Sequence, residues 1–270
     1  MIVRLHWWKE FRKDGLQNYG DLMSKYLVQK LSKKIVFTTR DKSNTYIKKI
    51  IKPYYIVIGS IIGAANKNAI VWGSGIIAKN QEVNNAKFLA VRGPETRKRL
   101  LQLNFEVPEI YGDPAILLPK FIKNNISKKY KLGVIPHFVD YPDIYAKLKL
   151  DNRIKVINLL TNDVEKTTQD IFECEQIISS SLHGIIVPHA YQIPALWVRF
   201  SNRLSGDDIK FYDYYQSVNI NFEKQIDIAI DDLSYELFIE ILNRLTSLVL
   251  PDHSHIINMQ NKLMDVCPFK

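Results

Sequence analysis

Three consecutive serines stand just before a histidine in the most informative segment of this sequence. The segment covers residues 177–198 and reads IISSSLHGIIVPHAYQIPALWV. Its opening isoleucines are typical of a buried strand, and the apolar residues after the serines are typical of a helix. A strand that turns through small hydroxyl residues straight into a helix directs several backbone N–H groups at one place, which suits an anion. The pattern therefore predicts an anion site at Ser179, Ser180 and Ser181.

His183 is the side chain of this segment that could do acid–base chemistry. An imidazole titrates near neutral pH, so it can give and take a proton under working conditions. Its place in the first turn of the predicted helix favours a catalytic role over a structural cap. His189 lies two turns deeper and is expected to be a core residue. His137 ends another predicted strand, where it could be either a substrate contact or a loop residue.

Two cations stand where they could meet an anionic substrate. Arg92 follows a predicted strand and precedes a Gly-Pro pair. Its guanidinium could form paired hydrogen bonds with a carboxylate or a phosphate, although a surface salt bridge is the alternative. Lys210 could supply a second charge to an anionic donor, although a plain surface lysine would fit that position equally well.

Short polar loops follow two neighbouring predicted strands. Gly59 and Ser60 end one strand, and Gly73, Ser74 and Gly75 end the next. Glycine lets a backbone come close to a ligand, so the two loops are expected to form one wall of a shared cleft. Neither loop matches the dinucleotide-binding or P-loop pattern, so nucleotide binding is not indicated.

Asn18 and Asp21 open the first long predicted helix. Helix capping explains them well, but their loop also lies at the carboxyl end of the first strand, where Asp21 could orient an acceptor hydroxyl. Asp113 could likewise be only a turn former. His253 and His255 have a spacing that could suit a metal, but they lack a nearby third ligand, so no metal site is predicted.

Strands and helices alternate along the chain, which is typical of parallel sheets covered by helices. We expect an α/β protein with two Rossmann-like, doubly wound parallel-sheet domains that face a cleft, with ligands beyond the carboxyl ends of the strands. The predicted strands, besides the one at 177–178, are 3–7, 35–38, 54–58, 69–72, 88–91, 131–136, 154–159 and 195–198. The predicted helices cover about 20–31, 94–103, 164–173, 208–216 and 235–248.

A polar, basic and Asn-rich stretch interrupts this alternation at residues 119–130 and is expected to be an interdomain linker. Residues 1–118 would then form the N-terminal domain, and residues 131–250 the C-terminal domain. Residues 251–270 are expected to form a C-terminal tail that could cross back to the first domain.

Composition narrows the class of protein further. A length of 270 residues with 46% hydrophobic residues is enough for two cores. The two cysteines, Cys174 and Cys267, exclude a disulfide framework and favour a reducing cytoplasm. Neither a secretory signal nor a membrane span is expected. The net charge of +9 suits an anionic substrate or an anionic membrane surface, and since no nucleic-acid-binding module accompanies it, no nucleic acid partner is expected.

Taken in order, the motifs resemble those of the polysaccharide pyruvyltransferase family. The resemblance covers about residues 15–216 and depends on the joint order of motifs that are individually loose. The motifs are NYGD (18–21), VWGSGI (71–76), VRGPETRKRL (91–100), YGDPAILLP (111–119), GVIPHFVDY (133–141), ISSSLHGIIVPHAYQIPALWV (178–198) and KFYDYY (210–215). The resemblance implies a fold similar to that of two-domain GT-B glycosyltransferases.

It also implies transfer of the pyruvyl group of phosphoenolpyruvate to a hexose as a cyclic ketal. Phosphoenolpyruvate would be the donor substrate, with no cofactor. The acceptor would be a galactose-like hexose, lipid-linked or part of an oligosaccharide, in cell-surface polysaccharide and exopolysaccharide synthesis. The first domain would hold the acceptor and the second the donor. The enzyme would work in the cytoplasm, with peripheral contact to the anionic inner face of the membrane.

The family histidine resembles His183, while Ser181 occupies the place where related enzymes often have an arginine. Arg92 and Lys210 are the expected substitutes. The predicted catalytic residues are therefore His183 and Arg92. The predicted substrate-binding residues are Asn18, Asp21, Gly59, Ser60, Gly73, Ser74, Gly75, His137, Ser179, Ser180, Ser181 and Lys210.

Two other functions remain open from the sequence. A GT-B glycosyltransferase would have the same fold and would bind a nucleotide sugar in its second domain. A nonenzymatic carbohydrate- or anion-binding module would use the same cleft without turnover.

Overall fold

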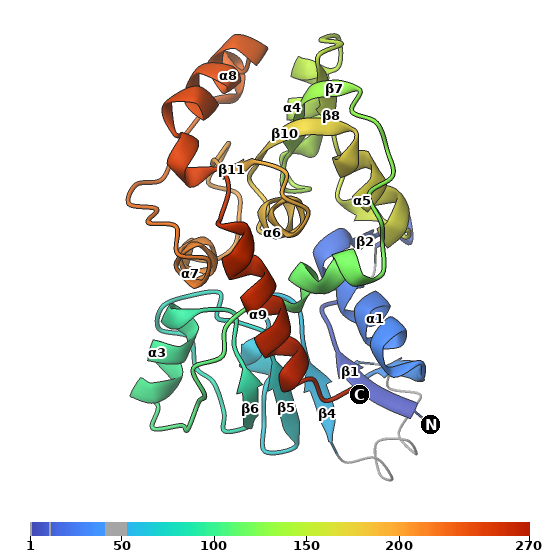
Figure 1. Ribbon diagram of the computed structural model, residues 1–270, viewed down its shortest axis with the longest axis vertical. Coiled ribbons are helices and arrows are strands. Elements are labelled where there is room, and N and C mark those ends of the chain that lie inside the picture. The colour runs from blue at the N-terminus through green and yellow to red at the C-terminus, as the bar shows by residue number, and fades with distance from the viewer. Residues whose placement is uncertain (1, 11, 41–52) are drawn as a thin grey trace.

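The computed structural model describes residues 2–10, 12–40 and 53–270. In this part of the chain, two parallel β-sheets with flanking helices build two lobes, one above the other in Figure 1. This confirms the predicted class of two Rossmann-like parallel-sheet units. The isolated bridge between Val91 and Tyr111 adds a short parallel contact at the edge of the lower sheet.

The sheet of the first lobe has the strand order β3-β1-β4-β5-β6, and all of its pairings are parallel. Its strands are β1 (Ile2–His6), β3 (Ile35–Thr38), β4 (Tyr54–Ile56), β5 (Ala69–Trp72) and β6 (Lys87–Ala90). The helices and 3₁₀ turns of this lobe are α1 (Tyr19–Ser32), η2 (Ile62–Ala64), α3 (Pro94–Gln102) and η3 (Pro114–Lys120). Helix α1 begins where predicted because the Asn18 side chain accepts a hydrogen bond from the Gly20 N–H group.

The sheet of the second lobe has the order β11-β10-β7-β8 and is also parallel. Its strands are β7 (Tyr130–Ile135), β8 (Ile154–Val156), β10 (Cys174–Ser179) and β11 (Ala195–Trp197). The helical segments are α4 (Tyr141–Leu148), α5 (Val164–Phe172), α6 (His183–Ala190), α7 (Ile209–Ser217), η4 (Ile230–Asp232), α8 (Tyr235–Arg244) and η5 (Thr246–Leu248). Every residue of α6 is buried, which explains why its sequence is apolar on all sides.

Several elements were not predicted from the sequence. Helix α4 follows β7, and its Pro142 lies in the first turn, where proline is well tolerated. The predicted strand 154–159 ends early, and residues Leu160–Thr161 (β9) instead pair antiparallel with Gln17–Asn18 (β2) of the first lobe. This pairing joins the backbones of the two lobes.

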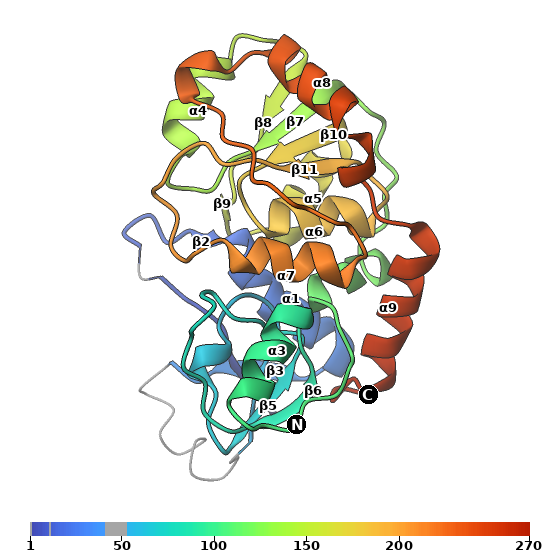
Figure 2. The same cartoon turned by 90° about the vertical axis from the view of Figure 1, so that its left-hand side faces the viewer.

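The C-terminal segment forms helix α9 (His253–Asp265), which runs from the second lobe to the first (Figures 1 and 2). The Trp72 indole N–H donates a hydrogen bond to the Leu263 carbonyl at 3.0 Å. Phe269 packs against the rings of Tyr55 and Trp72. The segment after residue 250 therefore covers the first sheet.

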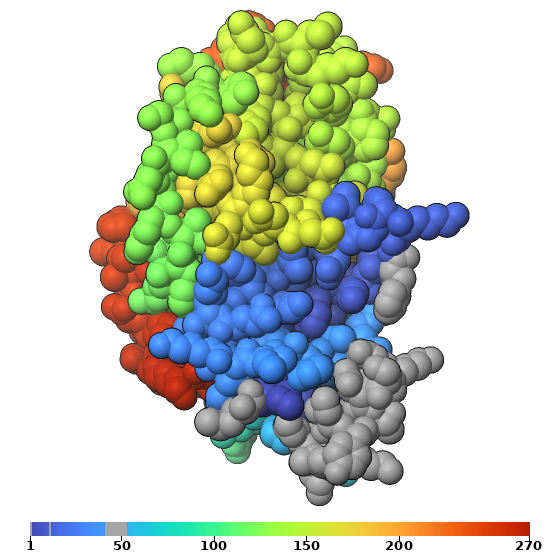
Figure 3. Space-filling model, turned by 90° about the vertical axis from the view of Figure 1, so that its right-hand side faces the viewer, coloured from blue at the N-terminus to red at the C-terminus, as the bar shows by residue number. Residues whose placement is uncertain are grey.

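The two lobes share a continuous hydrophobic core, which includes Leu27 of α1, Leu117 of η3 and Ile186 of α6. Figure 3 shows α1 (blue) directly against α5 (yellow). Between these helices, the Tyr19 and Thr168 hydroxyls lie 2.7 Å apart and are buried. The predicted domain limits at 118 and 131 stay a prediction, because the packing is continuous across them.

Candidate active site

A cavity of about 590 Å³ lies where the carboxyl ends of the two sheets meet. Loops after β1, β4, β7 and β10 contribute to its wall, so strands of both lobes position its residues. The predicted site residues that line the cavity are Asn18, Asp21, Gly59, Ser60, His137, Ser181, His183 and Lys210. Six others stand behind the wall: Gly73, Ser74, Gly75, Arg92, Ser179 and Ser180.

His183 is the first residue of α6, and its imidazole borders the cavity while the residue is only 8% exposed. The Nε2 atom lies 3.4 Å from the Oδ2 atom of Asp113. Among the described residues, Nε2 has no hydrogen-bond partner, so this contact has ion-pair distance without hydrogen-bond alignment. On the other side, a Cβ atom at Gly20 would come within 2.1 Å of Nδ1. The ring is therefore held between a buried carboxylate and a glycine that leaves it just enough room.

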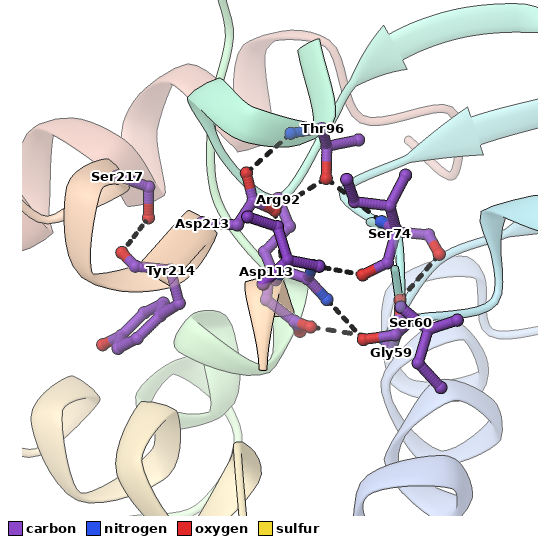
Figure 4. Close-up of polar contacts among 12 residues, drawn as sticks. Gly59, Ser60, Ser74, Arg92, Thr96, Asp113, Asp213, Tyr214 and Ser217 are labelled. Atoms are coloured by element: carbon purple, nitrogen blue, oxygen red, sulfur yellow. Dashed lines mark hydrogen bonds and ion pairs between the residues drawn. The ribbon is translucent and has the colours of Figure 1, made fainter. Parts of the chain in front are cut away.

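Asp113 does more than form the predicted turn. It is fully buried, and its Oδ1 atom accepts a hydrogen bond from the Ala115 N–H group at 2.9 Å, which caps η3. Its Oδ2 atom accepts one from the Gly59 N–H group at 3.2 Å (Figure 4). One carboxylate thus fixes a loop of the cavity wall and faces His183.

Asp21 lies in the first turn of α1, at the cavity. Burial raises the pKa of its carboxyl to about 7, and the negative charge of Glu10 adds to this shift, while the charges of His183 and Arg40 oppose it. A carboxyl with this pKa can exchange a proton near neutral pH.

Lys210 makes one corner of the cavity electropositive, and His137 lines the same cavity. Burial lowers the pKa of the Lys210 ammonium, with Arg92 adding to the shift and Asp208 opposing it. Burial and the charge of Lys210 together lower the pKa of His137 to about 4, so this imidazole is neutral at pH 7. Lys210 forms no ion pair with any residue in the described part of the chain. An anion bound here would offset the positive charge of Lys210.

The serines contribute to the site differently from the prediction. The Ser179 hydroxyl donates to the Ile135 carbonyl and accepts from the Ser181 N–H group. The Ser180 hydroxyl accepts from the His137 N–H group at 2.9 Å. These two buried hydroxyls fix the turn, and Ser181 alone of the three lines the cavity. Within the described chain, α6 begins without a side-chain cap, so its first N–H groups can serve a ligand.

Arg92 does not reach the cavity, which corrects its predicted role as a direct substrate contact. It is fully buried, and its three guanidinium nitrogens donate to Asp213 Oδ2 at 2.9 Å, Ser60 Oγ at 2.6 Å and the Ile76 carbonyl at 2.7 Å (Figure 4). Asp213 lies on α7, which Figure 2 shows between the lobes, above α3. Each guanidinium nitrogen is engaged by a protein group, so Arg92 supports the cavity wall through Ser60 and does not line it.

The loop of residues 73–75 supports this network from behind the cavity wall. Gly73 has φ = +94°, and a Cβ atom there would come within 2.2 Å of a Pro114 side-chain carbon. The Ser74 hydroxyl donates to the Gly59 carbonyl at 2.7 Å. A Cβ atom at Gly75 would lie 2.5 Å from the Arg92 guanidinium carbon. These three residues therefore shape the loop and lie outside the cavity lining.

Other residues of the cavity wall were missed by the sequence analysis. They come from the end of β1 and from the loops after β1, β7 and β11, and include His6, Trp8, Glu10, Phe138, Arg203 and Ser205. The available signal was position, because these polar and aromatic side chains follow strands whose carboxyl ends face the cleft.

No group of three histidine, cysteine or acidic residues in the described ranges could hold a metal ion. His255 is used structurally, with its Nε2 atom 2.9 Å from the Ser217 carbonyl oxygen. None of the described helices combines the length and apolar character needed to cross a membrane.

These features define a two-lobed α/β protein with a cavity between parallel sheets that is lined by titratable side chains. A family model for polysaccharide pyruvyl transferase matches residues 18–202, so the chain belongs to this family, as its motifs predicted. Membership implies a transferase with a sugar acceptor. An uncharacterized protein of Acanthamoeba polyphaga mimivirus, L143, is 35% identical over 205 residues, which cover 73% of this chain and 69% of the relative. No solved structure gives a significant match.

Proposed function

We propose that the protein transfers the pyruvyl group of phosphoenolpyruvate to two hydroxyls of a hexose, forming a cyclic ketal and inorganic phosphate. The observation that carries this proposal is the His183 imidazole, held at the cavity wall between Asp113 and Gly20. Such a group can protonate a carbon beside an electropositive pocket.

The electropositive corner supports a donor with both a phosphate and a carboxylate. Lys210 offers an ammonium group, and the start of α6 offers backbone N–H groups. Helix N-termini and cations are the usual partners of such anions. In this proposal the family's arginine charge is replaced by Lys210, while Arg203, which is paired with Asp140 and Asp143, stands at the same wall.

The chemistry requires an acid. His183 donates a proton to the methylene carbon of phosphoenolpyruvate, using the electron pair of the carbon–carbon double bond. The neighbouring carbon becomes oxocarbenium-like, and the first hexose hydroxyl oxygen attacks it. The second hydroxyl oxygen then closes the ring as the carbon–oxygen bond to phosphate breaks. Of the two hydroxyl protons, one replaces the proton that His183 gave to the carbon, and the other leaves on the phosphate. A positioned acid contributes roughly 10²–10⁴-fold to such a step.

The acceptor in this proposal is a galactose-like hexose on a lipid or an oligosaccharide, used for cell-surface polysaccharide. The net charge of +9 supports a place at the cytoplasmic face of an anionic membrane. Salt-sensitive flotation with anionic liposomes tests this location, and absence of binding at low salt contradicts it.

The activity is tested by incubating the protein with phosphoenolpyruvate and a panel of methyl hexosides and lipid-linked sugars. We expect phosphate release and a product with the mass of a pyruvate ketal. His183→Ala should abolish both, while His253→Ala, which removes an exposed histidine of α9, should keep them. Binding of a nucleotide sugar, such as UDP-galactose, without phosphate release from phosphoenolpyruvate would favour a GT-B glycosyltransferase instead.

A further inference from the structure

The two walls of the cavity differ in chemistry. Lys210, His137 and Ser181 belong to the second lobe, which offers the electropositive corner. The first-lobe wall instead offers Trp8 and Asp21, accompanied by the carboxylate and amide side chains of Glu10 and Asn18. Carboxylates and amides form hydrogen bonds with neutral hydroxyl groups. A carboxylate repels a trianionic donor, and an uncharged amide offers it no charge attraction. The first-lobe wall is therefore suited to a sugar.

Trp8 is the aromatic residue of this wall. It is 47% exposed, and the Arg40 guanidinium carbon lies 4.4 Å from its ring centroid, which orders the indole. The other tryptophans, Trp7, Trp72 and Trp197, are at most 5% exposed. A half-exposed indole in a cavity is a hydrophobic surface that a folded monomer leaves open. A pyranose ring has a face made mainly of C–H groups, and such a face packs on an aromatic ring while the hydroxyls reach polar partners.

Asp21 lies beside this surface and close to the proposed acid. Gly20, its neighbour in the chain, is in contact with the His183 ring. A Cβ atom at Gly59 would lie 4.0 Å from Asp21 Oδ1, so the carboxylate faces the loop after β4. The charged groups that act on Asp21 are Glu10 after β1, Arg40 after β3 and His183 of α6. Asp21 thus stands next to the place where the acid meets the donor.

We infer that, within the acceptor site expected in the first lobe, Trp8 packs on the hexose ring and Asp21 removes the proton of the attacking hydroxyl. This inference depends on the proposed function. As the hydroxyl oxygen bonds to the donor carbon, its O–H bond breaks and the proton moves to the Asp21 carboxylate. His183 has by then given its own proton to the methylene carbon, and the second hydroxyl proton leaves with phosphate. Asp21 later returns its proton to His183 or to water, so both residues regain their starting states.

The packing of Trp8 on the hexose ring, which we call the sugar platform, is tested with Trp8→Ala and Trp8→Phe. The substrates are methyl β-galactoside and phosphoenolpyruvate. Trp8→Ala should raise KM for the sugar about tenfold and leave KM for phosphoenolpyruvate within about twofold. Trp8→Phe should recover most of the sugar affinity, because it keeps an aromatic face. Tyr145→Ala, which removes an aromatic side chain that is 45% exposed on α4, is the matched control and should change neither constant. An unchanged sugar KM in Trp8→Ala overturns the platform.

The base is tested with Asp21→Asn, which keeps the size of the side chain and cannot accept the proton. We expect kcat to fall by about 10²–10⁴-fold while calorimetric affinity for phosphoenolpyruvate stays unchanged. The wild-type rate should fall as the pH drops below about 7, because Asp21 then becomes protonated, and the residual rate of Asp21→Asn should lack this limb. Asp231→Asn, an exposed acid of η4, should behave as wild type. Near-normal kcat in Asp21→Asn overturns the assignment of the base.

A binding measurement separates this inference from the proposed function. Trp8 is the tryptophan most open to solvent, so methyl β-galactoside should change the fluorescence of the wild type and not that of Trp8→Phe. If phosphoenolpyruvate yields no phosphate but this difference is seen, the proposed function fails and the sugar platform stands. If phosphate is released and the sugar leaves the fluorescence of both proteins unchanged, the proposed function stands and the platform fails.

Discussion

The Nε2 atom of His183 lies 3.4 Å from the Oδ2 atom of Asp113, although the two residues come from different lobes. The carboxylate is fully buried, and its oxygens already accept the N–H groups of Gly59 and Ala115. A fixed carboxylate at this distance orients the imidazole ring. The position of the His183 ring therefore depends on a residue that the second lobe does not contain.

Replacing Asp113 with Asn should lower kcat about 10–10²-fold, because the carboxylate that faces and orients the His183 ring is lost. The change also weakens a cap and a loop contact, so the free energy of unfolding should fall by about 1–2 kcal/mol. Steady-state phosphate release and urea unfolding measure the two effects. Asp231→Asn is the surface control. A variant that loses stability but keeps kcat would show that Asp113 acts only on the fold.

Gly20→Ala tests the space around the imidazole. The new methyl group would fall 2.1 Å from Nδ1 of His183, so the ring must move. We expect activity to drop at least about 10²-fold, since displacing a catalytic group by an ångström has that effect. Gln29→Ala, on the exposed side of the same helix, should retain activity. A near-normal rate in Gly20→Ala would mean that the ring position is not critical.

The electropositive corner predicts a linked shift at His137. Burial and Lys210 hold the pKa of this imidazole at about 4. Lys210→Met removes the positive charge that disfavours protonation of His137, so the pKa of His137 should rise. Phosphoenolpyruvate bound to the wild type should raise this pKa as well, because its negative charge favours the protonated imidazole. NMR titration of the histidine signals measures both shifts.

Lys262→Met, which removes an exposed charge on α9, should leave the His137 titration unchanged. Lys210→Met should also weaken binding of phosphoenolpyruvate about 10–10²-fold, because it removes a charge-assisted contact. Equal affinity in Lys210→Met and wild type would place the donor elsewhere.

The buried pair of Arg92 and Asp213 predicts a large difference in stability. Both side chains have no exposed surface, so Asp213→Ala would leave an unpaired buried guanidinium and should lower the free energy of unfolding by roughly 3–5 kcal/mol. Glu175→Ala removes an exposed partner of Lys131 and should cost at most about 1 kcal/mol. Urea unfolding of both variants makes the comparison, and similar losses would contradict the role of the buried pair.

Much of the fold could be predicted because its signals are local. The strands 35–38 and 69–72 were predicted with their observed bounds, since short apolar runs between polar turns read as buried strands. The start of α1 followed from a capping residue at Asn18. The cavity residues at His183, Gly59 and Ser60 followed from the rule that ligands bind beyond the carboxyl ends of parallel strands.

The remaining features depend on neighbours that are distant in sequence. Arg92 follows a strand, as a ligand-binding residue often does. Its guanidinium instead donates a hydrogen bond to Asp213 on α7, which is 121 positions away in the sequence. Asp113 looks like a turn residue until the second lobe brings His183 beside it. The sequence by itself determined most of the strands and helices and the family motifs. Only the tertiary structure decided which polar groups pair with one another and which still face the cavity, because burial and pairing are properties of the packed chain.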